Sequence, residues 1–316
     1  MDMLRLANLQ ISLFIMIIIG MFLTKKGLVD NAGRSLLTDL CINLIIPCNI
    51  LKSCLTPFRG NILLTFGHLF LAGAVLEIVF IGLNQFLFNR YPEERKKVLQ
   101  YGTLVCNSGF LGYPIAEGVY GTTGTLYASV FLIPLRLIMW SVGTSYFIKQ
   151  KHNNKILIKK VLSHPCLIAV YMGVLVILFE IRLPEFLSMT VKYIGNCNAA
   201  VTMFIVGTIL AEIPLHSIWN KDSVLYSILR LVILPTIALL VSRIFRLDSI
   251  GTGIAILMTG MPAGATTAIF AARYKSDVKF ATQLTILSTV LSMGTILMWC
   301  FILNREFPLS LCNRVR

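Results

Sequence analysis

The sequence predicts an all-α membrane protein with about ten transmembrane helices, arranged as two inverted repeats of five helices. Three observations lead to this prediction. Hydrophobic residues make up 56% of the 316 residues and charged residues only 13%, about half of the roughly 25% that is usual in soluble domains. Apolar runs of about 20 residues, enough for a membrane-spanning helix, recur along the whole chain. The two halves also share short motifs at a nearly constant spacing.

The apolar runs define ten predicted helices with short connections, so we expect no separate soluble domain. The first run carries no small-residue cleavage motif and is expected to stay in the protein as a helix instead of serving as a signal peptide. The two repeats are expected to cover residues 1–150 and 151–316. The predicted helices lie at 7–24, 36–56, 62–88, 98–120, 123–148, 156–179, 185–211, 224–243, 248–273 and 280–303.

The distribution of lysine and arginine predicts the orientation of the chain. The net charge is +14, and the loops after odd-numbered helices hold most of the basic residues, including the cluster Lys149, Lys151, Lys155, Lys159 and Lys160. Basic loops face the cytoplasm, so we predict both termini on the outer side of the inner or plasma membrane of the cell. Contact with anionic lipid explains the positive charge, and we expect the lipid bilayer, not nucleic acid, as its partner.

An internal repeat relates the two halves. The pair Cys48-Asn49 in the second predicted helix recurs as Cys197-Asn198 in the seventh, 149 residues later. Pro114 in the fourth helix has its counterpart in Pro262 of the ninth, 148 residues later. Both offsets move five helices onto five helices. Because five is an odd number, the second half enters the membrane in the opposite orientation, and the predicted repeat is inverted.

The fourth and ninth predicted helices each contain residues that destabilise a helix. The fourth holds NSGFLGYP at 107–114 and the ninth holds GMPAG at 260–264. In a helix interior, glycine costs about 1 kcal/mol and proline about 3 kcal/mol relative to alanine. Two interrupted helices at corresponding places of two repeats indicate a transport site, and the N-terminus of each half-helix suits an anion. The alternative is that these residues only bend helices or let them pack closely.

The interruptions supply the candidate residues of a substrate site. We expect the side chains and backbone N–H groups beside the breaks to bind a carboxylate. The predicted substrate-binding residues are Asn107, Ser108, Gly109, Gly112, Pro114, Gly260, Pro262, Gly264, Thr266 and Thr267. Polar and ionisable residues elsewhere inside predicted helices are secondary candidates, namely Asn43, Asn49, Glu117, Arg136, Asn196 and Asn198.

Each secondary candidate also has a structural interpretation. Glu117 either takes a coupling proton or pairs with a basic residue. Arg136 either neutralises a substrate carboxylate, or forms an ion pair or extends toward the membrane interface. The four asparagines either face the site or form hydrogen bonds between helices. Arg230 lies near the end of a predicted helix, where a structural role is favoured.

Three stretches of the chain resemble the auxin efflux carrier family. CNSGFLGYPIAEGVYG resembles the family's N-x-G-F-L-G-x-P stretch, and INLIIPCNIL resembles its second helix. MPAGATTAIFAARYKSD followed by ILSTVLSM resembles its M-P-P-A-x-N-x-x-x-L-A-x-x-Y…LLSTLLS ending. The similarity covers nearly the whole chain and fits the compact, bacterial-type members. The chain departs from the family pattern at Pro262-Ala263, usually a proline pair, and at Thr266, usually asparagine, so its substrate could differ from theirs.

The resemblance implies both a fold and a function. It implies ten helices in two inverted repeats, with the fourth and ninth helices crossing near the middle of the membrane. It also implies secondary transport of small organic anions, such as malate, malonate or an auxin-like acid, by an elevator motion. In this motion the third to fifth and eighth to tenth helices carry substrate past a scaffold of the first, second, sixth and seventh helices. Two copies are expected to form a homodimer through that scaffold.

Other functions remain as alternatives. A sodium- or proton-coupled transporter of another substrate, such as a bile-acid:sodium symporter, shares the crossed-helix design but usually has more acidic or polar residues near the crossing. A membrane sensor binds its ligand without moving it and commonly carries a soluble signalling domain. An enzyme is not expected, because no HExxH motif or paired intramembrane aspartates occur. Cysteines and histidines lack metal-site spacing, so we predict no cofactor and no metal.

Overall fold

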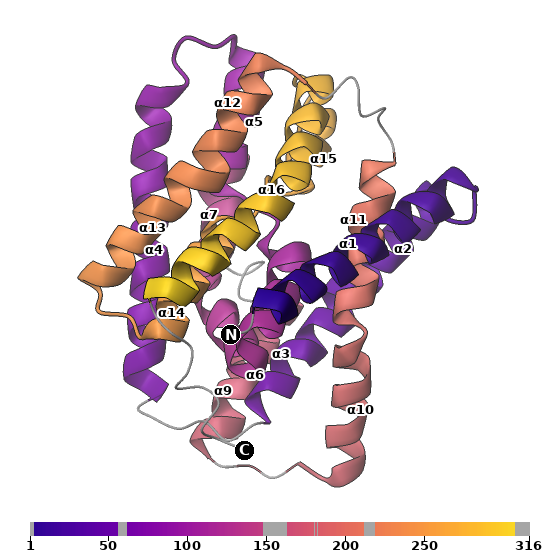
Figure 1. Cartoon of the computed structure of the whole chain (residues 1–316), viewed down its shortest axis with the longest axis vertical. Helices are drawn as coiled ribbons and strands as arrows, with labels where there is room; N and C mark the ends of the chain where they lie inside the picture. Colours follow the sequence, from indigo (N-terminus) through magenta and orange to yellow (C-terminus); the bar gives the residue numbers. More distant parts are fainter. Residues whose placement is uncertain are drawn as a thin grey trace.

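The computed structural model describes residues 3–55, 62–147, 163–179, 181, 183–211 and 219–306, which fold almost entirely into helices (Figure 1). No strand occurs among these residues, which confirms the all-α prediction. The predicted boundary between the repeats, at residues 150 and 151, lies outside the described residues. The predicted cytoplasmic lysine cluster at 149–160 lies outside them as well.

The helices follow one another along the chain in a simple order, and short π-helical turns within them carry the label η. The first half contains α1 (Met3–Lys25), α2 (Asn31–Leu40), η1 (Cys41–Ile45), α3 (Ile46–Cys54), α4 (Ile62–Leu87), α5 (Glu93–Leu104), η2 (Ser108–Gly112), α6 (Tyr113–Phe131), α7 (Ile133–Ile138) and η3 (Met139–Gly143). The second half contains α9 (Pro165–Leu178), α10 (Glu185–Asn196), α11 (Asn198–Leu210), α12 (Lys221–Ile228), η5 (Leu229–Ile233), α13 (Leu234–Ile244), α14 (Ser249–Thr259), α15 (Thr266–Arg273) and α16 (Val278–Glu306).

Within the described ranges, six helical runs are long and apolar enough to cross a membrane. They are Asn31–Cys54, Leu64–Leu87, Ser108–Gly143, Glu185–Leu210, Lys221–Ile244 and Val278–Arg305, and shorter apolar helices cover Ile11–Lys25, Pro165–Leu178 and Ser249–Thr259. These helices indicate a multi-pass membrane protein. Gly121, with φ 65° and ψ −154°, interrupts the run Ser108–Gly143 between the fourth and fifth predicted helices, and the ninth is divided into α14 and α15. The arrangement of ten helices in two inverted repeats stays a prediction.

Prolines shape several of the helices through π-helical turns. Pro47, Pro114 and Pro235 each lie in the first turn of an α-helix that directly follows η1, η2 or η5. Proline has no N–H group and clashes with the preceding turn, and a local π adjustment inside a membrane helix relieves this conflict. The helix therefore continues through Pro114, where the sequence predicted an interruption.

Glycines allow the closest helix pairs. Helix α1 packs along α11 (Figure 1). A Cβ atom on Gly20 would lie 2.5 Å from the carbonyl oxygen of Phe204, and one on Gly207 would overlap the carbonyl oxygen of Ile17. Small residues let helix backbones approach closely in membranes, where packing drives association.

The helices surround two junctions, one between α5 and η2 and one between α14 and α15. Helix α3 contacts α9 and α10, while α4 packs against α6, α7 and α13, and α16 packs against α12 and α15. Residues 101–108 and 251–264, which include most of both junctions, are all buried. The packing thus encloses the segments for which the sequence predicts a site.

Candidate functional site at the crossing of two interrupted helices

The first interruption lies between α5 and η2. Helix α5 ends at Leu104, Val105 adopts an extended conformation, and helical structure resumes at Ser108. The sequence predicts the break at 107–114, so the interruption begins earlier and is shorter than expected. Gly109 and Gly112 lie inside η2, and a Cβ atom on Gly112 would be 2.9 Å from the Met258 sulfur. This glycine therefore serves close packing against α14, which is the alternative interpretation of the glycines in this stretch.

The second interruption lies between α14 and α15, where the sequence predicts it. Helix α14 begins at Ser249 and ends at Thr259, and α15 begins at Thr266. Residues 260–265 between them are not helical. The side chain of Asp248 caps the start of α14 by accepting a hydrogen bond from the Gly251 N–H group at 2.8 Å.

The two interruptions contact each other through their backbones. The Asn107 N–H group donates to the Pro262 carbonyl at 2.8 Å, and the Gly264 N–H group donates to the Val105 carbonyl at 3.1 Å. These bonds flank an antiparallel bridge between Cys106 and Ala263. Backbone N–H and carbonyl groups in a membrane interior need hydrogen-bond partners within the protein. Here each broken segment supplies such partners to the other.

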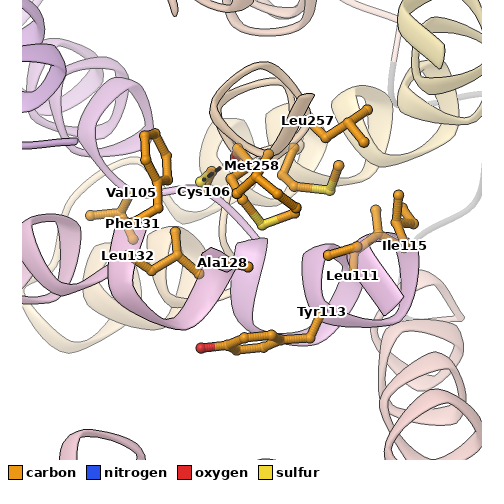
Figure 2. Close-up of a cluster of buried hydrophobic side chains, with 14 of the residues drawn as sticks. Val105, Cys106, Leu111, Tyr113, Ile115, Ala128, Phe131, Leu132, Leu257 and Met258 are labelled. Atoms are coloured by element: carbon orange, nitrogen blue, oxygen red, sulfur yellow. Dashed lines mark hydrogen bonds between the residues drawn. The ribbon is translucent and has the colours of Figure 1, made fainter. Parts of the chain in front are cut away.

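Apolar side chains surround this crossing. Figure 2 shows Val105 and Cys106 of the first break beside Leu257 and Met258 at the end of α14. The Cys106 thiol donates to the Met258 carbonyl at 3.3 Å. From the neighbouring helix α16, the Ser288 hydroxyl accepts a hydrogen bond from the Ala263 N–H group at 3.2 Å. The crossing is therefore held from both sides by hydrogen bonds within an apolar setting.

A cavity of about 150 Å³ opens beside the crossing. Five of the predicted substrate-binding residues line it, and all five lie at the two interruptions. They are Asn107, Ser108, Gly109, Gly264 and Thr266. Val105, Cys106 and Ala265 of the interruptions and Phe110 of η2 also line it, and neighbouring elements contribute Ile42, Ile46, Leu135, Arg136, Met139, His164 and Cys166.

The polar groups of this cavity are mainly hydrogen-bond donors. Arg136 on α7 donates through Nη2 to the Tyr113 hydroxyl at 3.1 Å, while its Nη1 is buried and has no hydrogen-bond partner among the described residues. His164 caps α9, and its Nδ1 accepts from the Cys166 N–H group at 3.3 Å. A neutral imidazole then carries its proton on Nε2. No Asp or Glu occurs among the lining residues that the structure describes.

Five other predicted residues lie outside the cavity lining. Pro262 supplies the carbonyl bonded to Asn107, and Pro114 lies in the first turn of α6. Gly112 packs against Met258 as described above. Thr267 is fully buried, and a Cβ atom on Gly260 would lie 3.1 Å from the Pro235 side chain.

Glu117 pairs with a basic residue, as its structural interpretation predicts. Its carboxylate forms an ion pair with the Lys52 ammonium group on α3, and that group also donates to the Asn196 side-chain oxygen at 3.1 Å. This cluster joins α3, α6 and α10, and it does not line the cavity. The Lys52 side chain is only 10% exposed.

The remaining asparagines also lie outside the cavity. The exposed Asn43 side chain donates to the Asp39 carbonyl of its own helix at 2.8 Å. Asn49 and Asn198, the repeat-related pair, are both buried, and neither side-chain amide has a partner within the described part of the chain. They thus neither line the cavity nor form the interhelical hydrogen bonds that the sequence suggested.

Sequence-based reasoning missed the positions of two polar residues near the crossing. His164 lines the cavity, and the only sequence signal for it is its position directly before Pro165, at the start of a helix. Arg230 is 1% exposed, although the sequence places it near a helix end. The structure begins that helix at Lys221, which moves Arg230 into the interior.

Comparison with known proteins identifies the family of the chain. Residues 8–300 match the model of a family described as membrane transport protein. A protein of Methanocaldococcus jannaschii, named uncharacterized transporter MJ1031, is 22% identical over 299 residues, which cover 92% of this chain and 96% of that protein. A protein of Methanothermobacter thermautotrophicus, named uncharacterized transporter, is 25% identical over 300 residues, which cover 93% and 97%. The chain therefore belongs to the membrane transport protein family, as its motifs predict, and is a membrane transporter and not an enzyme.

Proposed function

We propose that this chain is a secondary transporter that binds small organic anions, such as short carboxylates, in the cavity at the crossing. The observation that carries the proposal is the Arg136 guanidinium group, which lines the cavity with a buried Nη1 that lacks a partner among the described residues. An unpaired charge buried in a protein interior is costly. A carboxylate beside Nη1 removes this cost and gains a charge-assisted hydrogen bond.

Backbone and side-chain donors support the same ligand. The first N–H groups of a helix have no carbonyl partner within it and carry a positive partial charge. Helix α15 begins at Thr266 in the wall of the cavity, and the helical stretch η2–α6 begins at Ser108 in the same wall. The Asn107 side chain adds an amide donor. The apolar walls, including Ile46 and Phe110, suit the carbon skeleton of an organic acid.

The position of the cavity supports an elevator mechanism. In this proposal the scaffold comprises α1, α2–α3, α9 and α10–α11, and the remaining helices carry the substrate. Ile46 and His164 approach the cavity from the proposed scaffold, while Asn107, Arg136 and Thr266 approach it from the proposed moving part. A ligand held mainly by the moving part can travel with it. We further propose inverted repeats, a homodimer through the scaffold, and outward-facing termini in the cell membrane.

Uptake into proteoliposomes tests the proposal. Purified protein is reconstituted and supplied with radiolabelled small mono- and dicarboxylates. Asn107→Ala and Thr266→Ala each remove one hydrogen-bonding group, worth about 0.5–1.5 kcal/mol, and should lower uptake at subsaturating substrate by about two- to tenfold. Thr236→Ala is the matched control, because Thr236 is exposed on α13 and bonds only to its own helix, at the Val232 carbonyl. Equal uptake by the wild type and both cavity variants would contradict the assignment.

A further inference from the structure

A second, smaller cavity lies where the C-terminal ends of α5 and α14 approach the crossing. Its volume is about 10 Å³, close to the space that one water molecule needs. Its lining includes Glu77 on α4, Arg230 on η5, and Cys106, Met258 and Thr259 at the crossing. Helix N-termini line the larger cavity, which is the proposed anion site, so the two cavities contact opposite ends of the interrupted helices.

Arg230 binds one backbone carbonyl at the end of α5 and one in the non-helical segment after α14. Its Nε donates to the Met261 carbonyl at 2.9 Å, and its Nη1 donates to the Thr103 carbonyl at 2.7 Å. One helical turn earlier, the Tyr226 hydroxyl donates to the Gly102 carbonyl at 2.6 Å. The last carbonyls of a helix have no partner within it. Donors from the eighth predicted helix thus satisfy them at both breaks.

The charges at this position are complementary. Each helix C-terminus behaves like about half a negative charge, so the two ends together amount to about one negative charge. The guanidinium group of arginine keeps its proton under all ordinary conditions. The buried Arg230 therefore places a positive charge beside both ends.

In transporters built from discontinuous helices, unwound carbonyls and half-helix C-termini are the groups that coordinate a sodium ion or a proton. Here the Thr103 and Met261 carbonyls already bind Arg230. The Glu77 carboxylate lies in the same cavity, and its Oε2 is buried without a hydrogen-bond partner in the described ranges. Two carbonyls and a carboxylate form an oxygen-rich set of the kind that hard cations prefer.

We propose that Arg230 is a built-in cation at the position where a crossed-helix transporter would otherwise bind sodium, so that this chain needs no sodium ion to hold its crossing together. Arg230 is a positioning residue, because it acts through the backbone of the breaks and not through contact with substrate. The corollary that uptake is independent of sodium rests on the proposed transport function. The role of Arg230 itself does not, and it can be measured without any organic anion.

Thermal unfolding of purified protein in sodium chloride and in choline chloride of equal concentration tests this role. The wild type should unfold at the same temperature in both salts. Arg230→Ala should be less stable in choline chloride, and sodium should raise its unfolding temperature by at least about 3 °C, because an ion that binds only the folded state stabilises it. Arg230→Ala combined with Glu77→Gln should lose that sodium effect. Arg230→Lys keeps the charge and should remain insensitive to sodium.

Two results would overturn the proposal. One is a folded Arg230→Ala variant, monodisperse in gel filtration, that unfolds at the same temperature in both salts. The other is sodium-dependent stabilisation of the wild type that Glu77→Gln abolishes, since it would mean that a sodium ion binds beside Arg230. If Arg230→Ala does not fold in either salt, the wild type and Arg230→Lys decide. A sodium-insensitive wild type together with a folded, sodium-insensitive Arg230→Lys variant supports the proposal.

Discussion

Replacing Arg136 by methionine should strongly weaken the binding of a carboxylate. The guanidinium group is already oriented by the Tyr113 hydroxyl at 3.1 Å, and its Nη1 has no partner among the described residues. A ligand beside Nη1 would leave the bond between Nη2 and Tyr113 in place. A hydrogen bond to a charged group contributes about 1.5–3 kcal/mol, and each 1.4 kcal/mol changes an affinity about tenfold. We expect the Kd to rise about 10- to 150-fold.

Isothermal titration of purified protein with the best carboxylate from the uptake screen measures this change. Tyr113→Phe keeps the cation and removes only the group that orients it, so its Kd should rise less, by about two- to tenfold. Arg305→Met is the matched control, because Arg305 lies exposed near the end of α16. The carboxamide analogue of the same acid should bind the wild type and Arg136→Met about equally. Wild-type affinity of Arg136→Met for the acid would refute the role of Arg136.

Two further predictions concern stability. Glu117→Gln leaves the mostly buried Lys52 without its ion-pair partner. This should lower the free energy of unfolding by about 1–3 kcal/mol, after allowance for the partly exposed carboxylate. The unfolding temperature should fall, and adding Lys52→Met should partly restore it, which would show the coupling in a double-mutant cycle. Gly207→Ala introduces a methyl group against the Ile17 carbonyl oxygen. The overpacking should destabilise the fold by about 1–3 kcal/mol and lower the unfolding temperature. Gly82→Ala is the control, because a Cβ atom there has open space, and it should leave the unfolding temperature unchanged.

The sequence predicts the fold class well because apolar length is a direct consequence of the bilayer. It predicts the first interruption less well. The glycines and the proline between 107 and 114 suggest a break, but they lie in η2 and in the first turn of α6, and the helix continues through them. The extended residue Val105 lies instead in a segment whose backbone partners come from the ninth predicted helix. Because these backbone partners are distant in sequence, the residues around Val105 carry no local signal that predicts the break.

The same reasoning explains which site residues could be predicted. Residues adjacent to the breaks, such as Asn107 and Thr266, line the cavity because the cavity lies beside the interruptions. His164 reaches the cavity from a neighbouring helix, and only tertiary packing places it there. Glu117 lies only a few residues beyond the break, but its ion pair with Lys52 depends on how α3 packs against α6. Proximity in sequence therefore does not decide which charged residues line the cavity.

A structure of the transporter in a lipid nanodisc, determined by electron cryo-microscopy with the tightest-binding carboxylate, tests the proposed site most directly. We predict density for the acid between Asn107 and Thr266, with its carboxylate beside Arg136 Nη1 and the Val105–Gly264 and Asn107–Pro262 backbone bonds intact. Density for the acid elsewhere in the protein, or breaks that do not meet, would contradict this prediction.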